Sequence, residues 1–307
     1  MNFFEGPEKK YEIIMHENAS SLRDLGASFW QKNVELACAQ VITAISNNVC
    51  DAYLLSESSL FVYDDRAIMI TCGETTLAKS LVYILKNVDK NDIAMVFYER
   101  KNHHFPERQK YQFDEDCKYI SEHIPVNVFC FGDAKDNHVH LLHMDKPYSA
   151  PQQDVTLEIL MHGIGENAAK FFEKKYDSNR SSFYEKTGID KIFQGFKVDD
   201  FFFDPQGYSL NAIKDDDYYT IHVTPQKTGA YVSFETNASL KTQDEITEVA
   251  KKVLDIFRPE TFDVVFFCNG EACAVPHIDN IHYKNLQDSI ETFCGYTVTF
   301  QTYTKKR

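Results

Sequence analysis

The sequence predicts an α+β fold with two antiparallel β-sheets that derive from an internally duplicated unit. Short apolar runs rich in β-branched and aromatic residues recur throughout the 307 residues, whereas long segments of helical period are few. A hairpin, a helix and a strand follow one another in the same order in both halves of the chain. Two copies of one unit are expected to form two similar sheets that pack together.

The first copy of this unit lies in the N-terminal half. Tyr53–Val62 and Ala67–Thr71 are predicted to pair as a hairpin across a short polar connection. Thr75–Val88 has leucines at helical spacing and predicts a helix. The run DIAMVFYER, which begins at Asp92, predicts the strand that follows.

The second copy begins with YYTIHV and AYVSFET, which flank TPQKTG as a predicted hairpin between Tyr218 and Thr236. The segment TQDEITEVAKKVLDIF predicts a helix that begins at Thr242, with Glu245 at the spacing of a capping box. The run FDVVFFC from Phe262 predicts the next strand.

Further strands are predicted between the two copies for VNVFCFG, HVHLLHM, TLEILMHGI and FFFDPQGYSL. Short helices are expected near Glu166–Lys175 and Ser181–Lys186, and the polar run YDSNRSSFYEKTG from Tyr176 is expected to be an exposed connection. No linker separates two domains, so we expect one domain over residues 1–307.

The composition argues against several classes of partner. A net charge of −14 disfavours nucleic acid and anionic membranes and favours a cationic ligand. No apolar run approaches the roughly 20 residues that span a bilayer. The eight cysteines form no CxxC pair and are expected to be mostly reduced thiols. We therefore expect a soluble, cytoplasmic protein.

The polar stretch Ser56–Ser59 stands between two apolar runs and allows two interpretations. One is a polar loop or a phosphorylation site. The other is self-cleavage, in which the Ser58 hydroxyl attacks the preceding carbonyl and converts the Glu57–Ser58 amide to an ester. β-Elimination would then break the chain and leave a pyruvoyl group at Ser58. Such a carbonyl binds a substrate amine and serves as an electron sink.

Seven segments favour the second interpretation because they occur together in one order. They are FFEGPEK (3–9), LSESSLFV (55–62), ITCG (70–73), TLEILM (156–161), GYSLNAI (207–213), TIHVTP (220–225) and YVSFETN (231–237). In this combination the chain resembles the eukaryotic S-adenosylmethionine decarboxylase proenzymes over nearly its whole length. The resemblance implies a four-layer α/β/β/α sandwich.

The resemblance also implies a function and a cofactor. Cleavage between Glu57 and Ser58 would leave a chain 1–57 and a chain 58–307 headed by the pyruvoyl group, with no metal. The implied reaction is the decarboxylation of S-adenosylmethionine to the aminopropyl donor for spermidine and spermine synthesis. Family members include monomers, homodimers and heterodimers, so the oligomeric state stays open.

Individual residues match functional positions of this family. Cys72 matches the general acid, Ser209 and His222 match residues that assist self-processing, and Glu8 matches a catalytic carboxylate. The residues that match substrate-binding positions are Phe4 and Phe203, which enclose the adenine, Glu5, and Gln226, which replaces a glutamate that holds the ribose.

A second group of residues is acidic. Asp154, Thr156 and Glu158 alternate along a predicted strand and therefore share one face. With Glu12 and Glu235 they match a buried cluster that receives putrescine in many family members. Glu99 adds a charge where relatives have a small hydroxyl, and Ile70 replaces a lysine common in mammalian members, so the response to a diamine stays open.

Two alternatives to the enzyme remain. Gln206 and Gln226 depart from the family pattern. Such departures are compatible with a catalytically weak or altered-substrate paralogue that serves as a regulatory subunit of a decarboxylase. A plain acidic binding protein would show an intact chain and no carbonyl group. His138, His140 and His143 have no carboxylate or cysteine partner at ligand spacing, and we expect them to be structural or surface residues.

Overall fold

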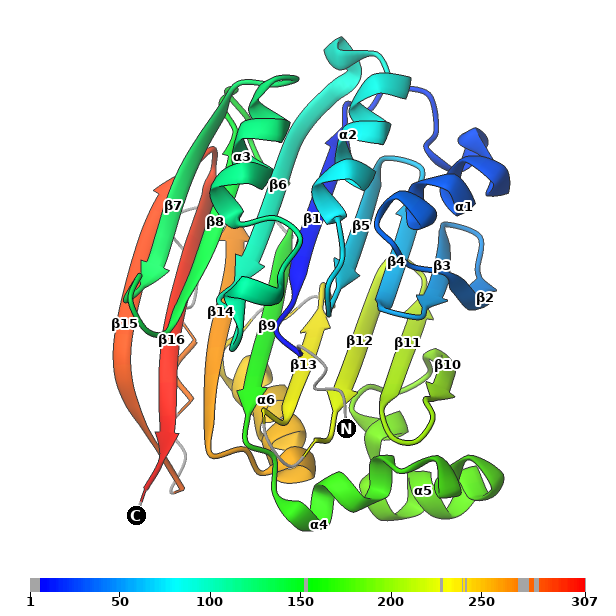
Figure 1. Ribbon diagram of the computed structural model, residues 1–307, viewed down its shortest axis with the longest axis vertical. Coiled ribbons are helices and arrows are strands. Elements are labelled where there is room, and N and C mark those ends of the chain that lie inside the picture. Colours follow the sequence, from blue (N-terminus) through cyan, green and yellow to red (C-terminus); the bar gives the residue numbers. More distant parts are fainter. Residues whose placement is uncertain are drawn as a thin grey trace. The chain divides into compact units, whose positions relative to one another are not determined.

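A computed structural model describes residues 6–151, 154–226, 229–238, 240, 242–269, 276–278 and 282–306 (Figure 1). The chain folds as two units, of which Pro7–Tyr148 is the first and Ser149–Arg307, with Gly6, the second. Each unit contains one antiparallel sheet of eight strands.

The sheet of the first unit has the strand order β2-β3-β4-β5-β1-β6-β8-β7. Strand β1 therefore lies at the centre, between β5 and β6. The strands are β1 (Lys9–Met15), β2 (Val41–Ser46), β3 (Cys50–Leu55), β4 (Ser58–Tyr63), β5 (Arg66–Thr71), β6 (Ile93–Lys101), β7 (Val126–Gly132) and β8 (His138–Met144).

The sheet of the second unit has the order β10-β11-β12-β13-β9-β14-β16-β15. Its strands are β9 (Val155–His162), β10 (Lys197–Phe202), β11 (Tyr208–Lys214), β12 (Asp217–Thr224), β13 (Tyr231–Thr236), β14 (Thr261–Asn269), β15 (Tyr283–Phe293) and β16 (Tyr296–Lys305).

The two strand orders are the same once eight is added to each strand number of the first sheet. The main helices also correspond, because α2 (Leu77–Asn87) joins β5 to β6 and α6 (Gln243–Phe257) joins β13 to β14. The predicted duplication into two antiparallel sheets is confirmed. Two such α/β units are what a four-layer α/β/β/α sandwich requires, so the architecture fits the predicted fold class.

Three helices cover one face of the first sheet: α1 (Ala27–Leu36), α2 and α3 (Phe113–Ser121) (Figure 1). A buried polar cluster joins this layer to the central strand. The Tyr11 hydroxyl of β1 donates to Asn33 Oδ1 of α1 at 3.0 Å, and Asn33 Nδ2 donates to the Ser80 carbonyl of α2 at 2.8 Å. Ser80 Oγ donates to the same Asn33 oxygen at 2.9 Å. Asn33 therefore links three elements.

In the second unit, α6 begins at the predicted cap, where the Thr242 hydroxyl accepts from the Glu245 N–H and the Glu245 carboxylate accepts from the Thr242 N–H. The buried face of α6 packs against alternate residues of β9 and β14. The helices before β10 are α4 (Glu166–Ala169) and α5 (Arg180–Thr187). The prediction of an exposed connection after Tyr176 is wrong in part, because Phe183 of α5 is buried in this core.

A second correction concerns Tyr53–Val62, which is not one strand. The chain reverses at Ser56-Glu57. Tyr53 therefore belongs to β3, which ends at Leu55, and β4 begins at Ser58. The sequence does not locate the reversal because residues 56–59 include none of the usual turn residues Gly, Pro, Asn and Asp.

The sequence predicts mostly reduced cysteines and no membrane-spanning segment. Within the described residues, Cys268 is disulfide-bonded and the free thiols are Cys38, Cys50, Cys72, Cys117, Cys130 and Cys294. Across the same residues, no helix combines the length and apolarity needed to cross a membrane.

The Asn33 cluster generates a stability prediction. Asn33→Leu leaves the Tyr11 and Ser80 hydroxyls buried without their shared acceptor, and we expect a loss of about 2–4 kcal/mol in the free energy of unfolding. Tyr11→Phe keeps the Asn33–Ser80 bonds and should cost about 1 kcal/mol. Urea unfolding of both variants measures the difference, and equal losses would contradict the linking role of Asn33.

Candidate active site

The first candidate site is centred on the turn between β3 and β4. Ser56 and Glu57 form a two-residue loop that Leu55 and Ser58 close as a register pair. Ser58 has φ 143°, a conformation that side chains other than glycine rarely adopt. A residue in such a region stores roughly 1–3 kcal/mol of strain. The strain therefore lies at the residue that follows the Glu57–Ser58 bond.

The turn is held from outside by the segment before β2. The Ser56 N–H donates to the Gln40 carbonyl at 2.8 Å, and the Gln40 N–H donates to Ser56 Oγ at 3.0 Å. Both hydrogen bonds fix Ser56, so the loop cannot relax by rotating outward. This accounts for a turn that lacks the usual Gly, Asn or Asp.

Strand β5 brings Cys72 to this turn. Ser58 pairs with Thr71, the last residue of β5, and Cys72 follows. Ser58 Oγ lies 2.9 Å from Cys72 Sγ. The Cys72 N–H donates to the Glu57 carbonyl oxygen at 2.8 Å. One residue thus contacts both the hydroxyl and the carbonyl that a self-cleavage reaction would join.

Burial dominates the electrostatics of this centre. Burial, reinforced by the charge of Glu8, raises the pKa of the Cys72 thiol far above its usual value, so the thiol keeps its proton at neutral pH. Burial also raises the pKa of Glu57 to about 7, although Lys110 and Lys9 oppose the shift. The site therefore holds a protonated thiol beside a carboxyl that titrates near neutrality.

Lys9 is a residue of this centre that the sequence reasoning missed. Its side chain is 2% exposed, and Nζ donates to the Thr75 carbonyl at 2.9 Å. Burial and the neighbouring Arg100 lower the pKa of Lys9 to about 7. No sequence pattern singles out Lys9, because its burial follows from the central place of β1 between β5 and β6.

The second candidate site lies on the sheet of the other unit, on the face opposite α6. Ser209, His222 and Ser233 form one register row across β11, β12 and β13. Ser209 Oγ lies 3.0 Å from His222 Nδ1, and Thr220 Oγ1 lies 3.0 Å from His222 Nε2. Both ring nitrogens are thus held by hydroxyl groups.

These contacts define what His222 can do. The ring is 4% exposed, and burial lowers its pKa to about 3. The imidazole is therefore neutral at physiological pH, with one nitrogen able to accept a proton. A neutral, oriented imidazole beside a serine hydroxyl is suited to proton transfer.

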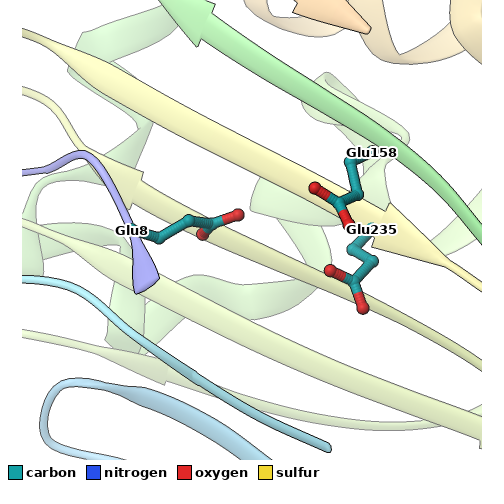
Figure 2. Close-up of side chains that lie close together, drawn as sticks. All are labelled: Glu8, Glu158 and Glu235. Atoms are coloured by element: carbon teal, nitrogen blue, oxygen red, sulfur yellow. The ribbon is translucent and has the colours of Figure 1, made fainter. Parts of the chain in front are cut away.

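The neighbouring register row on the same face of this sheet contains two acidic residues. Glu235 of β13 and Glu158 of β9 are register partners, and both are 1% exposed. Figure 2 shows the two carboxylates on neighbouring strands, and an oxygen of one lies within 4.8 Å of an oxygen of the other. The Tyr218 hydroxyl donates to Glu235. Two buried like charges at this separation favour a cationic ligand.

The remaining acidic residues are placed differently. Asp154 precedes β9 and accepts from the Tyr296 hydroxyl at 2.5 Å, and Thr156 lies two residues before Glu158 on the same face. Glu12 belongs to β1 of the first unit, where it forms an ion pair with Arg66 at 3.3 Å. Its charge is therefore balanced within its own sheet.

Two predicted substrate-binding residues lie at the ends of strands. Phe203 follows β10, and its N–H donates to the Gly207 carbonyl at 2.9 Å. Gly207 has φ 131°, and an added Cβ there would lie 3.3 Å from Phe203 Cβ, so this turn requires glycine. Gln226 is half-buried after β12. Phe4 and Glu5 lie outside the described residues.

The structure therefore brings together three sets of predicted residues, each within one unit. Glu57, Ser58 and Cys72 meet in the first unit. Ser209 contacts His222, and Glu158 lies beside Glu235, in the second.

Comparisons with known proteins show the family of this chain. The family model described as adenosylmethionine decarboxylase matches residues 1–304. The S-adenosylmethionine decarboxylase proenzyme of Drosophila melanogaster is 33% identical over 98% of this chain and 95% of its own length. The Xenopus laevis proenzyme is 35% identical over 87% of this chain and 84% of its own.

A solved structure shows the same likeness. The crystal structure of the Trypanosoma brucei AdoMetDC-delta26 monomer matches 81% of this chain and 99% of its own, with 25% identity and a TM-score of 0.65. The predicted resemblance is confirmed, and the chain belongs to the adenosylmethionine decarboxylase family.

Proposed function

We propose that this chain cleaves itself between Glu57 and Ser58 and then decarboxylates S-adenosylmethionine to the aminopropyl donor for polyamine synthesis. The observation that carries the proposal is the pair of contacts made by Cys72, through its thiol to Ser58 Oγ and through its N–H to the Glu57 carbonyl. Membership of a decarboxylase family supplies the reaction class.

In the first step, Ser58 Oγ attacks the Glu57 carbonyl carbon. Negative charge develops on the carbonyl oxygen, which the Cys72 N–H already contacts as a preorganised donor. The C–N bond breaks, the amine takes the hydroxyl proton, and an ester remains. The change also relieves the backbone conformation at Ser58.

In the second step, a base removes the Cα proton of residue 58 and the ester C–O bond breaks, which releases chain 1–57 as a carboxylate. His222 is assigned as this base because its ring is neutral and oriented by Ser209. Addition of water and loss of ammonia then convert the new terminus to the pyruvoyl group.

The residues around Ser58 fit such a group. Ser58 is 2% exposed, and the raised pKa of Cys72 keeps the neighbouring thiol protonated. When present, the pyruvoyl carbonyl supplies the electron sink for loss of CO2. Cys72 then donates its proton to the substrate Cα, and a thiol that does not ionise in the resting site retains the proton until a strong base forms.

Substrate and activator are assigned to the remaining residues. Phe203, with Phe4, would stack on the adenine, Gln226 would hydrogen-bond the ribose, and Glu5 and Glu8 would contact the substrate. Glu158 and Glu235, with Asp154, Thr156 and Glu12, would bind putrescine, whose two ammonium groups compensate buried carboxylates.

The first test is cleavage itself. We expect an intact mass spectrum of the denatured wild-type protein to show two chains that divide between Glu57 and Ser58, with a pyruvoyl terminus on the larger. Ser58→Ala removes the attacking hydroxyl and should remain one chain without activity. Ser59→Ala is the matched control and should be cleaved.

Two results would count against the proposal. Cleavage of Ser58→Ala would place the reacting bond elsewhere. An intact wild-type chain, even with putrescine or a partner chain added, would favour the regulatory paralogue over the enzyme.

A second test separates turnover from cleavage. Cys72→Ala keeps the backbone N–H at the Glu57 carbonyl but lacks the thiol proton donor. We expect cleavage to persist while kcat falls by about 10²-fold or more, as for other general acids. Single-turnover measurements with S-adenosylmethionine check this, and a wild-type kcat would exclude Cys72 as the acid.

A third test concerns the diamine. Glu235→Gln keeps the hydrogen bond from Tyr218 but removes one of two opposed buried charges. Without putrescine, Tm should stay equal or rise because repulsion is relieved, and the increase in Tm caused by putrescine should be lost. Asp216→Asn, at an exposed position of the β11–β12 turn, is the control. An undiminished shift in Glu235→Gln would argue against this site.

A further inference from the structure

A buried lysine lies in the same strand row as Ser58. Across β4, β5, β1 and β6, the register joins Ser58 to Thr71, Thr71 to Lys9, and Lys9 to Arg100. Lys9 is 2% exposed and Arg100 is 4% exposed. Two buried cations directly opposite each other are costly, so their placement indicates a role beyond packing.

The contacts of Lys9 lead to the segment that carries Cys72. Lys9 Nζ donates to the Thr75 carbonyl at 2.9 Å and to Thr75 Oγ1 at 3.3 Å. Thr75 Oγ1 in turn lies 2.8 Å from Thr71 Oγ1. Thr75 is three residues beyond Cys72, in the connection from β5 to α2. The ammonium group therefore holds Thr75, which contacts Thr71 on the other side of Cys72.

The charge of Lys9 also acts on the reacting groups. It lowers the otherwise raised pKa values of both Glu57 and Cys72. Its positive charge thus favours the negatively charged forms of the Glu57 carboxyl and the Cys72 thiol, the two titratable groups that adjoin the Glu57–Ser58 bond. The other charged or titratable groups that act on Lys9 or that Lys9 acts on are Arg100 of β6, Asp116 of α3, and His103 and Lys110 of the segment between them.

We propose that Lys9 is a positioning residue for self-cleavage, which holds the Cys72–Thr76 segment against the scissile turn and supplies positive charge beside the Glu57–Ser58 bond. The inference rests on the proposed function. Lys9 does not contact the reacting atoms itself, and it acts through Cys72, whose N–H stabilises the charge on the Glu57 carbonyl oxygen.

The test follows the appearance of chain 58–307 after synthesis of the full chain in a cell-free system. Lys9→Met should slow cleavage about tenfold or more, because the Cys72 N–H donor loses its support. Lys9→Arg retains the charge and should restore most of the rate. Lys10→Met is the matched control, because Lys10 is also buried on the same strand but faces the opposite side, and it should change the rate less than about twofold.

The pH dependence separates charge from hydrogen bonding. With a pKa of about 7, Lys9 is charged below pH 7 and neutral above it. The ratio of wild-type to Lys9→Met cleavage rates should therefore be largest near pH 6 and fall towards pH 8. The ratio of Lys9→Arg to Lys9→Met should stay constant, because arginine keeps its charge. Because Lys9 lowers the pKa of Glu57, the same ratios are also measured in a Glu57→Gln background, which removes the titration of Glu57.

Each outcome decides the inference. Equal rates for wild type and Lys9→Met, equal loss in Lys10→Met, or failure of Lys9→Arg to restore cleavage would overturn it. A pH-independent wild-type ratio would overturn the contribution of charge and leave the effect to the hydrogen bonds. Should Lys9→Met not fold, Lys9→Arg and Lys10→Met still decide between charge and simple burial. A wild-type chain that is not cleaved at any pH would overturn self-cleavage, and the inference with it.

Discussion

The hydrogen bond from the Cys72 N–H to the Glu57 carbonyl at 2.8 Å is the interaction on which the first site depends. It is a backbone bond, so its geometry follows from the β4–β5 register rather than from a side-chain rotamer. The same register places the Cys72 thiol against Ser58 Oγ. A shift of one residue in β5 would separate both contacts and turn the thiol to the other face of the sheet.

The duplication shows what distinguishes this turn from an ordinary one. The corresponding hairpin of the second unit joins β11 to β12 through Asp215-Asp216. There the positive φ of 50° falls on Asp215, a residue type that tolerates it within the loop. In the first unit the loop is Ser-Glu, and the positive φ falls on Ser58 at the start of β4. The same backbone topology thus stores strain in one copy and avoids it in the other.

Buried charge is divided unevenly between the two sheets. The first sheet buries Lys9 and Arg100 with Asp116 as a counter-charge, and Arg100 contacts Asp116 at 2.8 Å. The second sheet buries Glu158 and Glu235 as opposed partners, and the Tyr218 hydroxyl donates to Glu235. Burial of a charge is unfavourable unless another charge or a ligand compensates it. The first sheet thus sets two cations beside one carboxylate, whereas the second sets two carboxylates opposite each other.

The apolar periodicity and the caps determined much of the secondary structure. The repeated hairpin, helix and strand were predictable because both copies have the same pattern, and the start of α6 was predictable because Thr242 and Glu245 have capping-box spacing. The candidate residues Ser58 and Cys72 were also accessible from the sequence, since they lie in segments that resemble a known family.

Other features were decided by the tertiary structure alone. The reversal at Ser56-Glu57 was hidden because the loop has no Gly, Pro, Asn or Asp, the residues that usually mark a tight turn. The positive φ of Ser58, the N–H of Cys72 at the Glu57 carbonyl and the burial of Lys9 depend on strand register between segments far apart in the chain. Local sequence specifies which residues form a strand, but pairing energy summed over the whole sheet selects which residues face each other.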